Sequence, residues 1–189
     1  MTEQNCRLIV VTGPSGAGLP EIVDALMKKR TDLTAVTPIT ARKMKDGEVD
    51  GQSFWFYDLE GWNELKDNGD LLETTELAGN DYGTSRRLVR EALAKGKHVL
   101  LSVEPERAAQ VKKNMPESVC VYVEPSSEAL LRERYKKTAR NAFELAARME
   151  LAAEQRSIAA ACDFCVYSDD EIRAVSELCT FINGLTGAC

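Results

Sequence analysis

The chain has 189 residues, of which 44% are hydrophobic, and a formal net charge of -6 at pH 7. This size and composition suffice for one ordinary folded core, and the acidic balance argues against nucleic acid or an anionic membrane as a partner. The sequence has no run apolar enough to span a bilayer and no signal-peptide pattern in Met1–Cys6, so we expect a cytoplasmic protein.

The first apolar run, Leu8–Val11, predicts a buried strand that leads into a glycine-rich turn. The pattern G-x-x-x-x-G of a phosphate-binding loop is met by Gly13, Ser15, Gly16, Ala17 and Gly18. In a working loop, the next two residues are a Lys that neutralises phosphate charge and a Ser or Thr that holds Mg²⁺. Leu19 and Pro20 stand there instead, so the loop lacks both the cation and the hydroxyl.

Short apolar runs then alternate with helical patterns along the chain. We expect strands at Leu8–Thr12, His98–Val103, Val119–Val123 and Phe164–Tyr167, and helices at Glu21–Arg30, Glu106–Met115, Ser127–Tyr135 and Glu171–Asn183. This alternation predicts an α/β fold with a parallel sheet between helices. Because a residue that precedes proline is disfavoured in the α region, we expect the first helix to begin after Leu19.

Two stretches interrupt this alternation. Residues Ile39–Thr84 are richer in aromatic, glycine and β-branched residues, which predicts a small inserted β-rich lobe that binds a second substrate. The basic segment Arg132–Arg148 opens a helix that we expect to run to Ala161, as a lid or as a solvated helix face. We treat the chain as one domain with a core at about 1–38, 85–131 and 149–189, a lobe at about 39–84 and a lid at about 132–148.

The six cysteines are Cys6, Cys120, Cys162, Cys165, Cys179 and Cys189. In a cytoplasmic protein we expect them to be reduced structural thiols without disulfides. Cys162 and Cys165 have C-x-x-C spacing, but a zinc site needs two further ligands, and the only histidine is the distant His98. We therefore expect no metal site.

Several ordered motifs resemble those of the guanylate kinase family. They are Val10–Gly18, Gly47–Gly51, Gly79–Thr84, Ala108–Pro116 and Asp169–Asp170. The similarity extends over nearly the whole chain. It implies an ATP:GMP phosphotransferase fold, that is, a P-loop three-layer α/β sandwich with a parallel sheet, an inserted β-rich GMP-binding lobe and a helical lid.

The resemblance also assigns the GMP site position by position. The GMP-binding positions are Arg42, Lys45, Glu73, Tyr82, Thr84 and Glu104. Arg42 keeps the first arginine that grips the GMP phosphate, whereas Lys45 replaces the second and cannot form a bidentate fork. Phe54 replaces a tyrosine and offers no hydroxyl. The Glu73 carboxylate falls where the family accepts hydrogen bonds from guanine N–H groups, a donor pair that adenine lacks.

Two functional interpretations remain open because one cation on a transferring phosphoryl group contributes about 10³–10⁵ in rate. The first is a pseudo-enzyme that binds GMP or a related purine nucleotide, or a protein partner, without a tightly bound cofactor. The alternative is an active guanylate kinase that uses ATP and Mg²⁺, with catalytic Arg42, Arg134 and Arg148, in which lid arginines replace the missing lysine.

Overall fold

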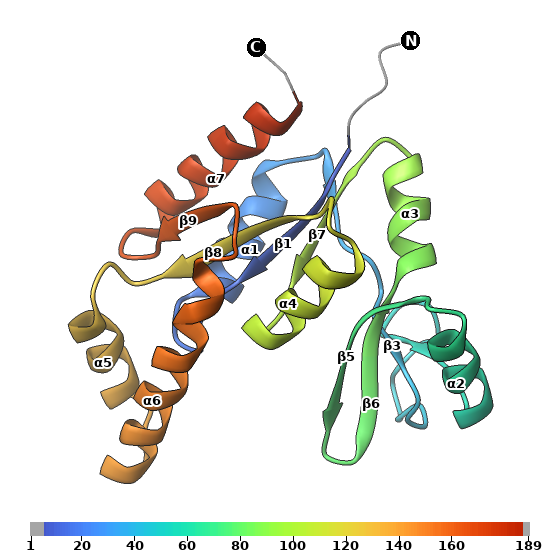
Figure 1. The fold of residues 1–189 in the computed structure, drawn as a ribbon, viewed down its shortest axis with the longest axis horizontal. Helices are drawn as coiled ribbons and strands as arrows, with labels where there is room; N and C mark the ends of the chain where they lie inside the picture. Colours follow the sequence, from blue (N-terminus) through green and yellow to red (C-terminus); the bar gives the residue numbers. More distant parts are fainter. Residues whose placement is uncertain (1–5, 187–189) are drawn as a thin grey trace.

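The computed structural model describes residues 6–186, and these residues form two β-sheets flanked by helices (Figure 1). The larger sheet has the strand order β2 (Leu33–Thr34), β7 (His98–Ser102), β1 (Leu8–Thr12), β8 (Val119–Glu124) and β9 (Phe164–Tyr167). Each pair of neighbouring strands in this sheet is parallel.

The central strand β1 is buried along its whole length because helices cover both faces of the sheet. One face carries α1 (Leu19–Lys29) and α7 (Glu171–Thr186), and the other carries α3 (Arg86–Ala94) and α4 (Pro105–Asn114). Ile9 and Val11 pack with the first pair, whereas Leu8 and Val10 pack with the second. The predicted three-layer α/β architecture is confirmed.

The smaller sheet forms a lobe beside this core. Its strand order is β4 (Trp55–Phe56), β3 (Ile39–Thr40), β6 (Asn80–Ser85) and β5 (Leu71–Leu77). The lobe also contains a helix that the sequence analysis missed, α2 (Leu59–Asp67). The Asp58 side chain caps α2 by accepting a hydrogen bond from the Gly61 N–H at 2.8 Å, and Trp62 packs α2 against Ile39.

On the other side of the core lie α5 (Glu128–Lys136) and α6 (Ala142–Ala159), so the lobe and this helix pair flank the large sheet (Figure 1). The predicted continuous helix from Arg132–Arg148 to Ala161 is wrong. The chain turns between α5 and α6 because the Asn141 side chain accepts a hydrogen bond from the Glu144 N–H at 2.8 Å and starts a new helix.

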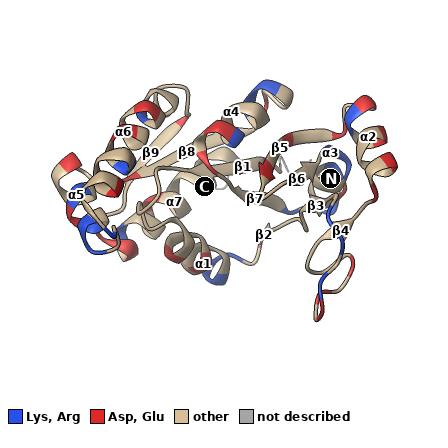
Figure 2. Ribbon diagram, turned by 90° about the horizontal axis from the view of Figure 1, so that it is seen from below, with Lys and Arg blue, Asp and Glu red and all other residues tan. Residues whose placement is uncertain are grey.

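Charges of both signs are mixed over the helices, as Figure 2 shows. In residues 6–186, none of the helices has the length and apolar character that crossing a bilayer requires.

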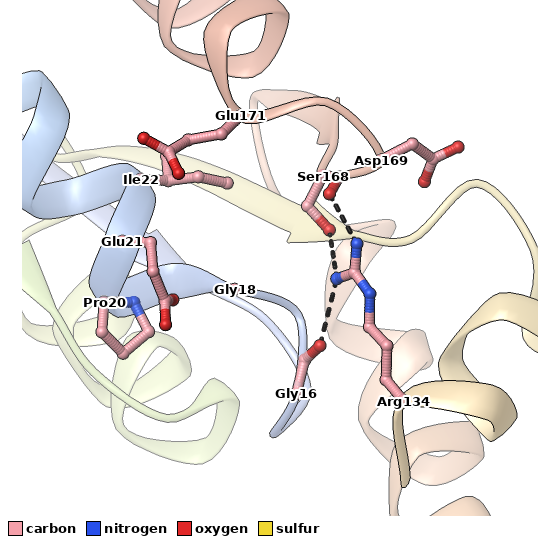
Figure 3. Close-up of a pocket in the computed structure, with 9 residues that line it drawn as sticks. All are labelled: Gly16, Gly18, Pro20, Glu21, Ile22, Arg134, Ser168, Asp169 and Glu171. Carbon is pink, nitrogen blue, oxygen red and sulfur yellow. Dashed lines mark hydrogen bonds between the residues drawn. The ribbon is translucent and has the colours of Figure 1, made fainter. Parts of the chain in front are cut away.

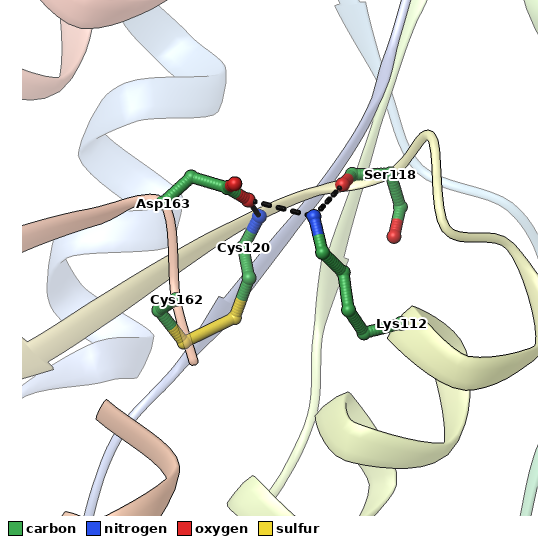
Figure 4. The surroundings of a disulfide bond; sticks show 5 residues. All are labelled: Lys112, Ser118, Cys120, Cys162 and Asp163. Atoms are coloured by element: carbon green, nitrogen blue, oxygen red, sulfur yellow. Dashed lines mark hydrogen bonds and ion pairs between the residues drawn. A yellow bond between two sulfur atoms is a disulfide. The ribbon is translucent and has the colours of Figure 1, made fainter. Parts of the chain in front are cut away.

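A disulfide joins Cys120 on β8 to Cys162, which follows α6 (Figure 4). The expectation that all the cysteines are reduced is therefore wrong for this pair, whose Cα atoms lie 4.7 Å apart, within bonding reach. Asp163, the residue before β9, accepts hydrogen bonds from the Cys120 N–H at 2.7 Å and from Lys112 Nζ at 3.0 Å. Cys165 is free and exposed, and Cys189 lies outside the described residues.

We expect reduction of this disulfide to lower the free energy of unfolding by about 2–4 kcal/mol, because it closes a loop with a sequence separation of 42 residues. The measurement is urea unfolding with and without dithiothreitol. The Cys120→Ser variant is the control and should not respond to the reductant. Equal stability of the oxidised and reduced wild-type protein would contradict the expectation.

Candidate functional site

The glycine-rich loop connects the end of β1 to the start of α1. Gly16 and Gly18 have φ values of 76° and 83°, in the left-handed region that favours glycine. The Ala17 N–H closes a turn on the Pro14 carbonyl at 3.0 Å. The loop therefore has the sharply curved backbone that lets successive N–H groups surround an anion.

Two of the loop glycines are also required by packing inside the protein. A Cβ atom on Gly13 would overlap the carbonyl oxygen of Val123, and one on Gly16 would lie 2.9 Å from the Tyr135 ring. Both constraints hold without a nucleotide. The glycines thus preserve the loop geometry whether or not the loop binds phosphate.

Helix α1 begins at Leu19, so the prediction of a later start is wrong. The left-handed conformation of Gly18 places the turn before Leu19, and the chain enters the helix directly. Pro20 fits the first helical turn, where a backbone N–H has no intrahelical partner. The Leu19 side chain packs against the core cluster that contains Ile9 and Val11.

The residues after the loop do not fit a Mg²⁺ ion of the P-loop type. Neither Leu19 nor Pro20 carries a side-chain oxygen. Within the described part of the chain, no three His, Cys, Asp or Glu side chains gather in a way that could hold a metal.

Arg134 of α5 ties the loop to the turn after β9 (Figure 3). Its Nη1 donates to the carbonyls of Gly16 and Ala17 and to Ser168 Oγ, each at 3.1 Å, and its Nη2 donates to the Ser168 carbonyl at 2.6 Å. The guanidinium therefore lies near the loop, where three backbone carbonyls and the Ser168 hydroxyl hold it.

Arg134 lies at the edge of a cavity of about 500 Å³ that Gly18 also lines. The other charged groups on its wall are the carboxylates of Glu21, Asp169 and Glu171 (Figure 3). The Ser126 side chain, together with a hydrogen bond from the Ser126 N–H at 2.8 Å, lowers the pKa of the Asp169 carboxyl, which stays ionised at neutral pH. Three carboxylates against one guanidinium disfavour a polyanion in this cavity.

A second cavity of about 420 Å³ lies between the loop and α6. Gly13, Ser15, Gly16 and Ala17 line it, together with Leu19, Glu104 and Arg148. Arg148 donates to Thr138 Oγ1 at 3.0 Å and to Glu144 Oε1 at 2.7 Å. Among the described residues that line this cavity, Arg148 is the only Arg or Lys.

A third cavity, of about 590 Å³, lies between the lobe and the large sheet. Of the predicted GMP-binding residues, its wall includes Arg42, Tyr82, Thr84 and Glu104. Glu104 also lines the loop cavity, so the two cavities meet at this residue. Lys45 is exposed and lies on a neighbouring surface depression, and Glu73 is buried behind the wall.

Arg42 is bound within the lobe. It forms a bidentate ion pair with Glu48, at 2.7 and 2.5 Å, and its Nε donates to the Tyr82 hydroxyl at 3.0 Å. The rings of Phe54 and Phe56 lie 4.9 and 5.4 Å from its guanidinium carbon. The hydrogen bond from Arg42 lowers the pKa of Glu48 to about 2. A ligand phosphate at Arg42 would have to share the guanidinium with this carboxylate.

Glu73 has a side chain that is 0% exposed and fully engaged. Its Oε1 accepts hydrogen bonds from Thr84 Oγ1 at 2.7 Å and from Arg107 Nη2 at 2.9 Å, and its Oε2 accepts one from Arg107 Nε at 2.5 Å. Burial lowers the pKa of Arg107, but the bonds to Glu73 outweigh it and raise the pKa overall. Arg107 was not among the predicted site residues, although its place one helical turn after Glu104 indicated a side chain near the strand end.

Known proteins share this arrangement of sheet, loop and lobe. A family model described as guanylate kinase matches residues 5–184. The chain belongs to the guanylate kinase family. It is 36% identical over 172 residues to a guanylate kinase of Carboxydothermus hydrogenoformans, which covers 90% of this chain and 84% of the relative. It is also 36% identical over 173 residues to a guanylate kinase of a Synechococcus species, with 91% of each chain covered.

The fold agrees with that of a solved relative. A crystal structure of guanylate kinase from Anaplasma phagocytophilum superimposes with a TM-score of 0.67 at 23% identity, covering 96% of this chain and 86% of that one. Membership in this family makes the protein a relative of nucleotide-binding kinases and transferases. The active members use ATP and Mg²⁺.

The Arg42–Glu48 pair gives a pH-dependent prediction. Because the folded-state pKa of Glu48 is depressed from 4.5 to about 2, the pair stabilises the protein above pH 4.5, and this stabilisation is lost as the pH falls toward 2. We expect Glu48→Gln to be less stable than the wild type at pH 6, with a difference that shrinks below pH 4.5. Urea unfolding at pH 6, 4 and 3 measures this difference.

Glu64→Gln is the matched control, since Glu64 is an exposed acid on α2 of the same lobe. The difference between this variant and the wild type should not follow the pattern of Glu48→Gln. A Glu48→Gln difference that stays constant from pH 6 to pH 3 would show that the ion pair does not stabilise the lobe.

Proposed function

We propose that this guanylate kinase family member is a pseudo-enzyme that binds GMP or a related purine nucleotide but does not transfer phosphate. The observation that carries the proposal is the pair Leu19 and Pro20 at the start of α1, where the phosphate-neutralising lysine and the Mg²⁺-binding hydroxyl belong. Leu19 instead packs into the core. Transition-state charge on a phosphoryl group would have neither partner there.

The distribution of charge around the loop supports this proposal. On one side, the cavity near Arg134 carries the carboxylates of Glu21, Asp169 and Glu171. On the other side, the lobe cavity keeps Arg42, Tyr82 and Thr84 on its wall and has the volume, about 590 Å³, of an ordinary small-ligand site. These features favour retention of a nucleoside monophosphate over retention of ATP. A protein partner of the lobe and a cytoplasmic location stay predictions.

One observation favours the alternative, an active guanylate kinase. Arg148 lines the cavity that the loop residues also line, and an Nη atom of Arg134 lies 3.8 Å from the position of a Cβ on Gly18. If either guanidinium moved from its present partners to a bound phosphate, it could supply positive charge that the loop lacks. In that case Arg148→Ala or Arg134→Ala would abolish GDP formation by the wild-type protein.

The deciding experiment restores the two missing groups. We expect wild-type protein to form no detectable GDP from ATP, Mg²⁺ and GMP, and the double variant Leu19→Lys, Pro20→Ser to form GDP at least about 10³-fold faster than the detection limit for the wild type, because one cation on the phosphoryl group contributes that much. The measurement is endpoint GDP formation at high protein concentration. Wild-type turnover that Arg148→Ala or Arg134→Ala removes would overturn the pseudo-enzyme proposal.

Two controls accompany this measurement. Arg42→Ala, added to the double variant, removes the phosphate contact, so GDP formation that survives it comes from a contaminating kinase. Thermal unfolding of each variant checks that Leu19→Lys, which gives up packing against the core cluster, still folds. A folded double variant that binds GMP and stays inactive would show that phosphate transfer needs further groups besides a lysine and a serine at positions 19 and 20.

A further inference from the structure

The carboxylate that would recognise guanine does not face the lobe cavity. The wall of that cavity includes Arg107, whereas Glu73 lies behind it with a side chain that is 0% exposed. Arg107 holds both Glu73 oxygens in a fork, through Nε at 2.5 Å and Nη2 at 2.9 Å. Its Nη1 donates to Glu104 Oε2 at 3.1 Å. The cavity thus presents a guanidinium where a free carboxylate was expected.

Guanine and the Arg107 guanidinium offer a carboxylate the same kind of hydrogen-bond donors. Guanine carries N1–H and the N2 amino group side by side, a planar pair of donors that suits a carboxylate. A guanidinium offers the same fork of two N–H groups and adds a positive charge. Arg107 donates to both oxygens of Glu73, and Thr84 Oγ1 donates to one of them at 2.7 Å. Guanine would therefore have to compete with Arg107 for the same two acceptors.

We propose that Arg107 is an internal substitute for guanine that occupies Glu73 and removes base selectivity from the cavity. The proposal rests on the proposed function, in that a purine monophosphate enters this cavity. With Glu73 occupied, the 2-amino group of GMP gains no acceptor from it. GMP and IMP, which differ only in that amino group, then bind alike.

The position of α4 does not depend on Arg107 alone, so its removal is compatible with folding. Gln110 exchanges two hydrogen bonds with the backbone of Thr74 on β5, at 3.0 and 3.2 Å. Asn114 donates to the Leu72 carbonyl at 2.9 Å. These contacts hold α4 on β5 when the ion pair is absent.

The experiment compares GMP and IMP binding by isothermal titration calorimetry in the wild type and in Arg107→Ala. We expect a ratio of GMP to IMP affinity near one in the wild type. In Arg107→Ala we expect GMP to bind about tenfold tighter than in the wild type and about tenfold tighter than IMP, because hydrogen bonds to the freed carboxylate are charge-assisted. The double variant Arg107→Ala, Glu73→Gln should lose this gain.

Arg87→Ala is the matched control, because Arg87 pairs with Glu91 on the exposed face of α3 and does not line the cavity. It should bind both nucleotides as the wild type does. The proposal is overturned if the wild type already prefers GMP about tenfold, since guanine would then reach Glu73 past Arg107. It is also overturned if Arg107→Ala is folded and binds GMP no better than IMP.

A second probe separates this proposal from the proposed function. If neither protein binds a nucleotide, nucleotide binding is the part that has failed, and millimolar methylguanidinium then tests Arg107 by itself. Methylguanidinium should raise the thermal unfolding midpoint of Arg107→Ala but not that of the wild type or of the double variant Arg107→Ala, Glu73→Gln. This result would show that a guanidinium group binds Glu73 in the position that Arg107 has left. The absence of that rise would overturn the proposal.

Discussion

The end of β1 lies so close to β8 that no side chain fits at Gly13, because its Cβ would overlap the Val123 carbonyl. This contact fixes where the chain leaves the sheet and turns into the loop. Gly16 then packs against Tyr135 of α5, which places the helix pair over the loop. Residues of this turn line the cavities near Arg134 and Arg148, so the packing of Gly13 and Gly16 sets the shape of both.

Three arginines that line the cavities are already bound to groups within the protein. Arg134 donates to the loop carbonyls and to Ser168, Arg42 is paired with Glu48, and Arg107 is paired with Glu73. The three arginines come from α5, the lobe and α4, respectively. An anionic ligand at Arg42 or Arg107 would therefore have to displace an existing ion pair, and one at Arg134 would have to displace hydrogen bonds to neutral oxygens, which reduces the net gain from binding.

The sequence was sufficient for the parts of the fold that depend on a continuous local pattern. The buried run Leu8–Thr12 and the alternation of strands with helices specified the parallel sheet and its order of layers. Elements that depend on one side-chain hydrogen bond were harder to predict. Asp58 starts α2 and Asn141 separates α5 from α6, and neither residue stands out in a region of mixed composition.

In the candidate site, too, some features were predictable from local motifs and others were not. Arg42, Tyr82 and Thr84 line the lobe cavity and were identified by their motifs. The pairing of Arg107 with Glu73 and that of Cys120 with Cys162 were not predicted. The partners in each pair lie far apart along the chain, and only the packing of α4 and α6 brings them together. A sequence shows which groups a site contains, whereas the fold decides which of them are already bound to each other.

Leu19 and Pro20 suit the fold whether or not the protein transfers phosphate. A lysine and a serine at the start of α1 would leave a cation and a hydroxyl that need solvent or a ligand, whereas Leu19 buries apolar surface against the core and Pro20 is preorganised for a first helical turn. Both residues suit the helix in the absence of a nucleotide. Leu19 and Pro20 are thus favourable for folding, so stability alone gives no pressure to replace them with a lysine and a serine.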